Sequence, residues 1–260
     1  MGYRRSGKRW NYPGVQQLNV MRADFTRRAD VATGACRLAS EPTDGPLPED
    51  RLSILYATVP GGAQAARARH PIAFTMVDIE AQLDSRAISP ASQTGAGRFN
   101  VWGNSFPAEH LPEPGSTVEV DGVPFAFAPL GADGDNLRCA GQFVPVPAGR
   151  YDWIHLLAAA ERRAEDHVAV HFADGSVDFE PLRISDFWSG AHPVFGDVLA
   201  FSTPVMHYPH HVQANVSALM WAQRVPVTRR TPMVGLGFPR NLAVHVFALT
   251  LQASSTGGGS

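Results

Sequence analysis

The sequence predicts an all-β protein, an antiparallel β-sandwich or jelly roll with at most one or two short helices. Short apolar or alternating runs recur at roughly 8–12-residue spacing, as is typical of sandwiches and barrels. The 24 glycines and 21 prolines separate these runs without a fixed period. Helical signals are weaker. Residues 154–161 are too short and too uniformly apolar to separate a helix from a buried strand, and a short helix could lie near 78–86.

The strands are expected, in chain order, at residues 51–59, 72–80, 116–120, 123–127, 167–172, 177–179, 198–202, 217–222 and 243–251. Asp121-Gly122 forms a two-residue hairpin turn between the third and fourth of these strands. Residues 173–176 join the fifth and sixth strands into a second hairpin. The last strand is almost entirely apolar, so we expect it to be central and covered on both faces.

One compact β domain is expected over residues 51–252, with residues 1–50 as a looser arm. Residues 253–260 are rich in glycine and serine and indicate a flexible tail. Residues 85–98 are rich in serine, alanine and glycine and are expected to form an exposed loop.

Composition narrows the class of protein. A hydrophobic content of 44 % excludes a disordered chain, and a net charge of −2 argues against a nucleic-acid partner. No apolar run is long enough to span a membrane, and residues 1–30 lack the apolar core of a signal peptide, so a cytoplasmic location is expected. Cys36 and Cys139 are expected to be two reduced thiols. The oligomeric state is open, and a homo-oligomer is one alternative.

Several standard catalytic motifs are absent. The sequence contains no GxSxG, no GxxxxGK[ST], no HExxH and no GxGxxG between a strand and a helix. Triad chemistry, nucleotide hydrolysis and dinucleotide redox therefore have no support in the sequence. We expect no cofactor and assign no metal site, although a structural Ca²⁺ is compatible with a sandwich of this kind.

The densest group of reactive side chains is the segment from Met206 to His211, which contains His207, Tyr208, His210 and His211. Imidazoles can act as general acids and bases near neutral pH, and they can also bind Zn²⁺. Pro204 and Pro209 place the segment on a loop, where the simplest alternative is a polar surface loop.

A second candidate segment runs from Phe99 to Phe106. Trp102 and Asn104, on either side of Gly103, suit a loop that stacks a ring and offers hydrogen bonds. The alternative is an anchor for the core where a strand meets a loop.

The third candidate segment is Ser185-Asp186-Phe187-Trp188. Asp186 could move or orient a proton, and Trp188 could wall a pocket. Alternatively, Asp186 caps a turn by accepting from backbone N–H groups. A glycosidase would need a second carboxylate at a defined separation. Candidate second carboxylates are Glu109, Asp178 and Glu180.

Residues 99–252 resemble the β-sandwich domain appended to many actinobacterial glycoside hydrolases. The resemblance rests on the order and spacing of the segments 99–109, 114–123, 135–136, 173–175, 184–188, 203–204 and 242–249. It implies a jelly-roll-like sandwich with a carbohydrate-associated history, and it implies no catalytic residue.

Two functions fit these observations. The first is a cytoplasmic enzyme of bacterial specialised metabolism that uses no cofactor and shapes a small apolar or glycosylated substrate, as a cyclase, isomerase or lyase does. Its proton-carrying residues would be His207, His210 and His211, with Asp186 as orienter. Its pocket would be lined by Trp102, Asn104, Tyr208 and Trp188. The second is a non-catalytic carbohydrate-binding module, in which Trp102 and Tyr208 stack on sugar rings. We expect the ligand of the enzyme in a hollow enclosed between the two layers of the sandwich, whereas a shallow groove with a flat row of aromatic side chains would favour sugar binding.

Overall fold

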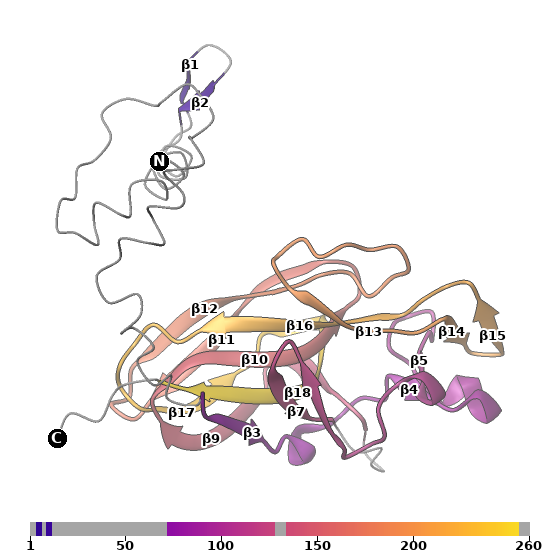
Figure 1. Cartoon of the computed structure of the whole chain (residues 1–260), viewed down its shortest axis with the longest axis horizontal. Coiled ribbons are helices and arrows are strands. Elements are labelled where there is room, and N and C mark those ends of the chain that lie inside the picture. Colours follow the sequence, from indigo (N-terminus) through magenta and orange to yellow (C-terminus); the bar gives the residue numbers. More distant parts are fainter. Residues whose placement is uncertain (1–3, 7–8, 12–71, 128–133, 255–260) are drawn as a thin grey trace, which may run out of the picture. The chain divides into compact units, whose positions relative to one another are not determined.

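A computed structural model describes residues 4–6, 9–11, 72–127 and 134–254 (Figure 1). The chain divides into two units, Met1–His70 and Pro71–Ser260. In the first unit, β1 (Arg4–Ser6) pairs with β2 (Arg9–Asn11) in an antiparallel manner. The predicted strand at 51–59 and most of the expected arm and tail lie outside the described residues. The predicted domain boundaries therefore stay predictions.

The second unit is an antiparallel β-sandwich, which confirms the predicted fold class. Its larger sheet has the order β13-β16-β10-β18-β3, and β8 also pairs with β18. The bounds are β3 (Phe74–Val77), β8 (Leu137–Ala140), β10 (Tyr151–Ala160), β13 (Val198–Ser202), β16 (Leu219–Pro226) and β18 (Arg240–Ala253). The smaller sheet has the order β12-β11-β17-β9. Its strands are β9 (Phe143–Gly149), β11 (Ala164–Phe172), β12 (Val177–Ile184) and β17 (Met233–Gly237).

Short elements complete the unit. Two are hairpins, formed by β6 (Thr117–Val120) with β7 (Val123–Ala126) and by β14 (Val205–Tyr208) with β15 (His211–Ala214). β4 (Ile88–Ser89) and β5 (Phe106–Pro107) form a parallel pair. Helical structure in the described residues is limited to three short 3₁₀ segments, Glu80–Gln82, Ala91–Ala96 and Ala108–His110.

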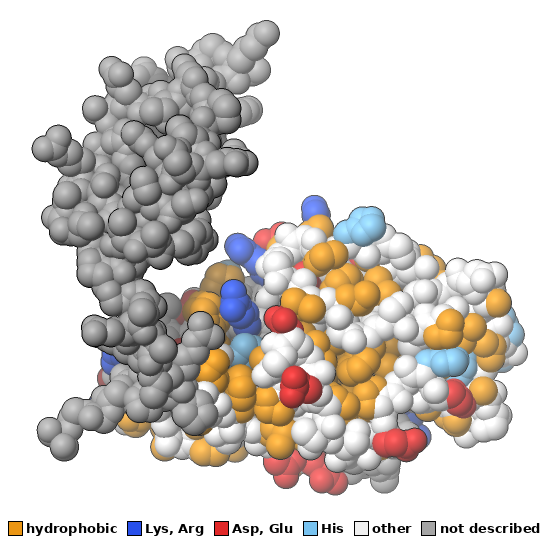
Figure 2. All heavy atoms as spheres, in the orientation of Figure 1, with side chains coloured by type: hydrophobic (Ala, Val, Ile, Leu, Met, Phe, Trp, Pro, Cys, Tyr) orange, Lys and Arg blue, Asp and Glu red, His pale blue; other side chains and the backbone are white. Residues whose placement is uncertain are grey.

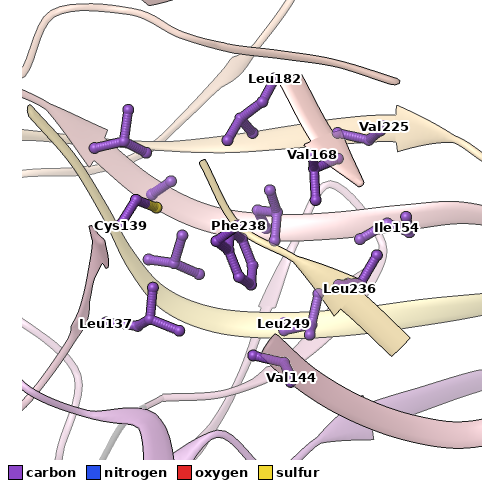
Figure 3. Close-up of a cluster of buried hydrophobic side chains, with 14 of the residues drawn as sticks. Leu137, Cys139, Val144, Ile154, Val168, Leu182, Val225, Leu236, Phe238 and Leu249 are labelled. Atoms are coloured by element: carbon purple, nitrogen blue, oxygen red, sulfur yellow. The ribbon is translucent and has the colours of Figure 1, made fainter. Parts of the chain in front are cut away.

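Buried apolar side chains fill the space between the two sheets. Figure 3 shows Ile154, Val225 and Leu249 of the larger sheet pointing toward Val168 and Leu236 of the smaller sheet. This packing corrects the expectation of a ligand-sized hollow between the layers. Alternate side chains of each strand meet here and exclude water from the centre, as two stacked sheets require.

The larger sheet is also covered on its other face. A second cluster of buried side chains packs Leu157 of β10 and Phe247 of β18 against Phe99, Phe106 and other residues of the segment 87–127. The last strand is therefore central and covered on both faces, as predicted. The same double burial explains why residues 154–161 show no alternation. Residues 154–160 lie in the strand β10, which pairs with β16 on one side and β18 on the other.

The structure tests two local predictions, a hairpin turn at residues 121–122 and an exposed loop at residues 85–98. The Asp121-Gly122 turn is confirmed, with φ values of 52° and 76° that match a two-residue hairpin turn. The expected exposed loop at 85–98 is wrong in part, because Ala87, Ile88 and Ser89 are buried. Inside the protein, the Asp135 carboxylate accepts hydrogen bonds from the N–H groups of Ala87 and Ile88 at 2.8 and 3.0 Å, which satisfies these two buried donors.

Candidate functional site

Five of the eight predicted site residues line one open cleft of about 550 Å³. They are Trp102, Asn104, Asp186, Trp188 and Tyr208. Phe187, Glu161 and Arg162 complete the lining, and we call this hollow the aromatic cleft. Its volume falls in the range of small-molecule sites. The cleft lies outside the packed core, where four separate segments of the second unit meet.

A tight turn positions Trp102 and Asn104. The Asn100 side-chain Oδ1 accepts hydrogen bonds from the N–H groups of both residues at 3.1 Å, and the Gly103 N–H donates to the Asn100 carbonyl at 3.0 Å. Gly103 has a φ of +72°, which favours glycine. The Trp102 ring is left 59 % exposed, as a stacking surface requires.

Asp186 and Trp188 are held where β10 ends and β16 begins in the larger sheet. Asp186 bridges to Ala160 and Trp188 to Ala218, while the Trp221 indole N–H donates to the Asp186 carbonyl at 2.9 Å. The Asp186 Oδ1 accepts from the Trp188 N–H at 3.0 Å. Asp186 therefore caps a turn, as one interpretation of the sequence held, and also lines the cleft.

Sequence reasoning missed Glu161 and Arg162, which lie in the turn between β10 and β11. Arg162 has a φ of +62°, and the Glu161 N–H donates to the Ala243 carbonyl at 2.8 Å. No motif marks them. The hairpin of β11 and β12 pairs Ala164 with Ile184, so it places this turn at the same end of the sandwich as residues 185–188.

The structure separates the three predicted histidines. Residues 205–214 form a β-hairpin rather than a loop, because Pro209 lies in its turn and leaves the strand hydrogen bonds intact. His207 is buried, His210 is exposed in the turn, and His211 is exposed and stacks on the Tyr208 ring at 5.0 Å. Within the described residues, no three His, Cys, Asp or Glu side chains are grouped to hold a metal ion.

His207 belongs to a buried polar cluster. Its Nδ1 lies 2.9 Å from the Ser89 hydroxyl, which lies 2.7 Å from the Ser105 hydroxyl. Burial lowers the pKa of His207, while the nearby carboxylate of Glu109 acts in the opposite direction. His207 is not among the residues that line the aromatic cleft. Its contacts are those of a side chain that holds β14 against the segment from Ser89 to Ser105.

A second cleft, of about 480 Å³, shares Trp102 with the aromatic cleft. We call it the basic cleft, because Arg98, Arg138 and His210 line it. Gly95, Gly97 and Gly103 supply part of its wall. Figure 2 shows histidine side chains toward the end of the unit where Figure 1 draws β14 and β15.

Each cleft is lined by an amide with an unused donor. In the described part of the chain, the Nδ2 atoms of Asn100 and Asn104 are buried and have no hydrogen-bond partner. Asn100 lines the basic cleft and Asn104 the aromatic cleft. Buried amides are normally paired, so these two unpaired donors beside the clefts call for a partner that the described residues do not supply.

The chain belongs to the family described as the AziU2-like beta-sandwich domain, which matches residues 74–255. The match begins where β3 begins and runs past the end of β18, so it spans both sheets and both clefts. The β-sandwich that the sequence resemblance implied is thereby confirmed, whereas an association with glycoside hydrolases stays a prediction. No curated protein matches the chain.

None of the helices in the described residues is long and apolar enough to cross a membrane.

Proposed function

We propose that this chain binds a small, partly apolar or glycosylated molecule in the aromatic cleft. It shapes this molecule for a cofactor-independent reaction of bacterial specialised metabolism, of the cyclase, isomerase or lyase type. The observation that carries the proposal is the convergence of Trp102, Trp188 and Tyr208 on a ligand-sized hollow that also contains two carboxylates. Membership of the AziU2-like family supports the link to specialised metabolism. A cytoplasmic location and the absence of a cofactor are part of the same proposal.

The cleft offers groups for both binding and proton transfer. Aromatic faces hold apolar or ring-shaped parts of a substrate and limit the conformations it adopts. Asp186 and Glu161 supply carboxylates that can accept or return a proton beside those faces. In this proposal Asp186 and Glu161 take the proton-carrying role that the sequence analysis gave to His207, His210 and His211, because none of these histidines lines the aromatic cleft.

A second candidate function is saccharide binding without chemistry. It is favoured by the exposure of the two indoles, 59 % for Trp102 and 37 % for Trp188. Sugar rings pack on exposed indole faces, while amides and carboxylates such as those of Asn104 and Asp186 bind hydroxyl groups.

Ligand-observed NMR with a library of small ring compounds, together with glucose, xylose and their oligomers, distinguishes the proposed enzyme from a carbohydrate-binding module. We expect ring compounds that bind the native chain to lose binding in Trp188→Ala. The matched control is Phe179→Ala, which removes a 70 % exposed ring of β12 outside both clefts and should leave binding unchanged. Equal losses in the two variants, or no binding by any compound, would refute the proposal.

The outcome with sugars decides between the two functions. Binding restricted to oligosaccharides, with affinity that rises with chain length, would identify a carbohydrate-binding module. For a compound that binds and is converted, Asp186→Asn or Glu161→Gln should retain binding and lose turnover.

A further inference from the structure

We propose that the basic cleft binds an oxyanion group (phosphate, sulfate or carboxylate) of the same ligand whose body lies against Trp102 in the aromatic cleft. This inference rests on the proposed function for the body of the ligand, and on independent observations for its anionic group. It assigns an anionic ligand to the site, which the aromatic cleft alone does not specify.

The charges that line the basic cleft are all of one sign. Arg98 and Arg138 each carry a guanidinium, His210 can carry a positive charge when protonated, and the lining contains no aspartate or glutamate. The nearest carboxylate in the hydrogen-bond network, that of Asp84, accepts from the Arg138 backbone N–H and is not part of the lining. Guanidinium groups suit oxyanions because they donate parallel hydrogen bonds.

The unused amide donor of Asn100 is the second observation. Asn100 is buried, and its Oδ1 is engaged by two backbone N–H groups of the Trp102 turn. Its Nδ2 has no partner in the described part of the chain, and the residue lines the basic cleft. A buried donor of this kind is stabilised by an acceptor such as an anionic oxygen.

The side chains of Arg98 and Arg138 differ in their contacts with the rest of the protein. The Arg138 Nε donates to the Leu242 carbonyl at 2.8 Å, which fixes the side chain along β18 and leaves its terminal nitrogens to other partners. Arg98 is exposed, and within the described ranges its guanidinium forms no hydrogen bond or ion pair. One fixed and one adjustable guanidinium can close on an anion from two sides.

Close packing fixes the hairpin turn that carries His210. A Cβ on Gly95 would lie 2.8 Å from the Pro209 oxygen, and a Cβ on Gly103 would lie 2.8 Å from the Pro209 Cγ. The turn therefore rests directly on two glycines of the cleft wall. His210 and Trp102 are held at neighbouring positions as a result, so that a ligand across Trp102 reaches both clefts.

The first test measures inorganic phosphate, sulfate and acetate alone, by ¹⁵N-edited NMR titration of the full chain at constant ionic strength set with chloride. We expect saturable shifts at Asn100 and its neighbours. The Arg98→Gln variant should weaken binding by roughly tenfold. Arg150→Gln removes an exposed arginine outside both clefts and should leave binding unchanged. No saturation with any of the three anions, or equal weakening in both variants, would overturn the anion site.

The second test distinguishes the anion site from the proposed function. Ring compounds that bind the aromatic cleft should bind Arg98→Gln as they bind the native chain. The same compounds with an added carboxylate or phosphate should bind the native chain more tightly, and this gain should disappear in Arg98→Gln. A gain that persists in Arg98→Gln places the anionic group elsewhere and refutes the inference, whereas failure of the uncharged compounds alone counts against the proposed function.

Discussion

His245 is expected to make folding stability depend on pH between neutrality and about pH 5. The side chain is fully buried on β18, its Nδ1 donates to the Asn136 Oδ1 at 2.7 Å, and its ring lies 4.3 Å from the Phe99 ring. In the described part of the chain, its Nε2 has no partner. Burial, with a smaller contribution from the positive charge of Arg138, lowers the pKa of His245 from 6.5 to about 3.

The sign and the size of this effect on the free energy of unfolding follow from the linkage between proton binding and folding. Below pH 6.5, His245 is protonated in the unfolded state but stays neutral in the folded state. Acidification therefore favours the unfolded state. Well above pH 6.5, His245 is neutral in both the folded and the unfolded state, so its contribution to the free energy of unfolding no longer changes with pH. At about pH 5 the unfolded group lies about 1.5 pH units below its pKa, so this one histidine removes about 2 kcal/mol from the free energy of unfolding.

Urea denaturation of the full chain at several pH values between about 7.5 and 5 measures this loss. The His245→Gln variant should show a shallower fall in stability toward acid, with His167→Gln, an exposed histidine, as the matched control. Burial also lowers the pKa of His155 and of His207, so part of the slope should remain in His245→Gln. Identical slopes for the native chain and His245→Gln would refute the reasoning.

Two further predictions concern the segment that covers the larger sheet. Asp135→Ala leaves the buried N–H groups of Ala87 and Ile88 without an acceptor and removes one of two acceptors of the Asn136 Nδ2. The free energy of unfolding measured in urea should fall by about 3 kcal/mol, while Asp78→Ala on the surface should change it little. An equal effect of both changes would contradict this. Gly103→Ala should destabilise by more than about 1 kcal/mol and weaken binding in both clefts, because its Cβ meets Pro209. Gly122→Ala has a similar φ of +76° but open space around it, so a thermal shift as large as that of Gly103→Ala would show that contact with Pro209 is irrelevant.

The sequence predicted the β-sandwich because turns and covered strands are indicated by residues that are neighbours in the chain. Asp121-Gly122 specifies a turn by its backbone preference, and the apolar run at 243–251 specifies a covered strand by composition. Trp102 and Trp188 were found as site candidates because an indole beside small polar residues is a local pattern as well. Both indoles do lie in one cleft.

The rest depends on contacts between distant segments. His207 was grouped with His210 and His211 by spacing, but the alternation of a β-strand and the hydroxyl of Ser89 bury it apart from them. Two four-residue runs around Pro209-His210 were the available signal for a hairpin. Glu161 was missed because no local pattern marks it; the β11–β12 register and the bridge between Ala160 and Asp186 place its turn beside Asp186.

The double covering of β10 and β18 separates the behaviour of the clefts from that of the interior. Because buried clusters cover both faces of these central strands, we expect their amides to exchange with water only through unfolding of the whole unit. The turns that form the two clefts lie largely outside the buried clusters that cover β10 and β18. Ligand binding in either cleft is therefore expected to leave the exchange of the central amides unchanged, because the clefts share few residues with the two buried clusters.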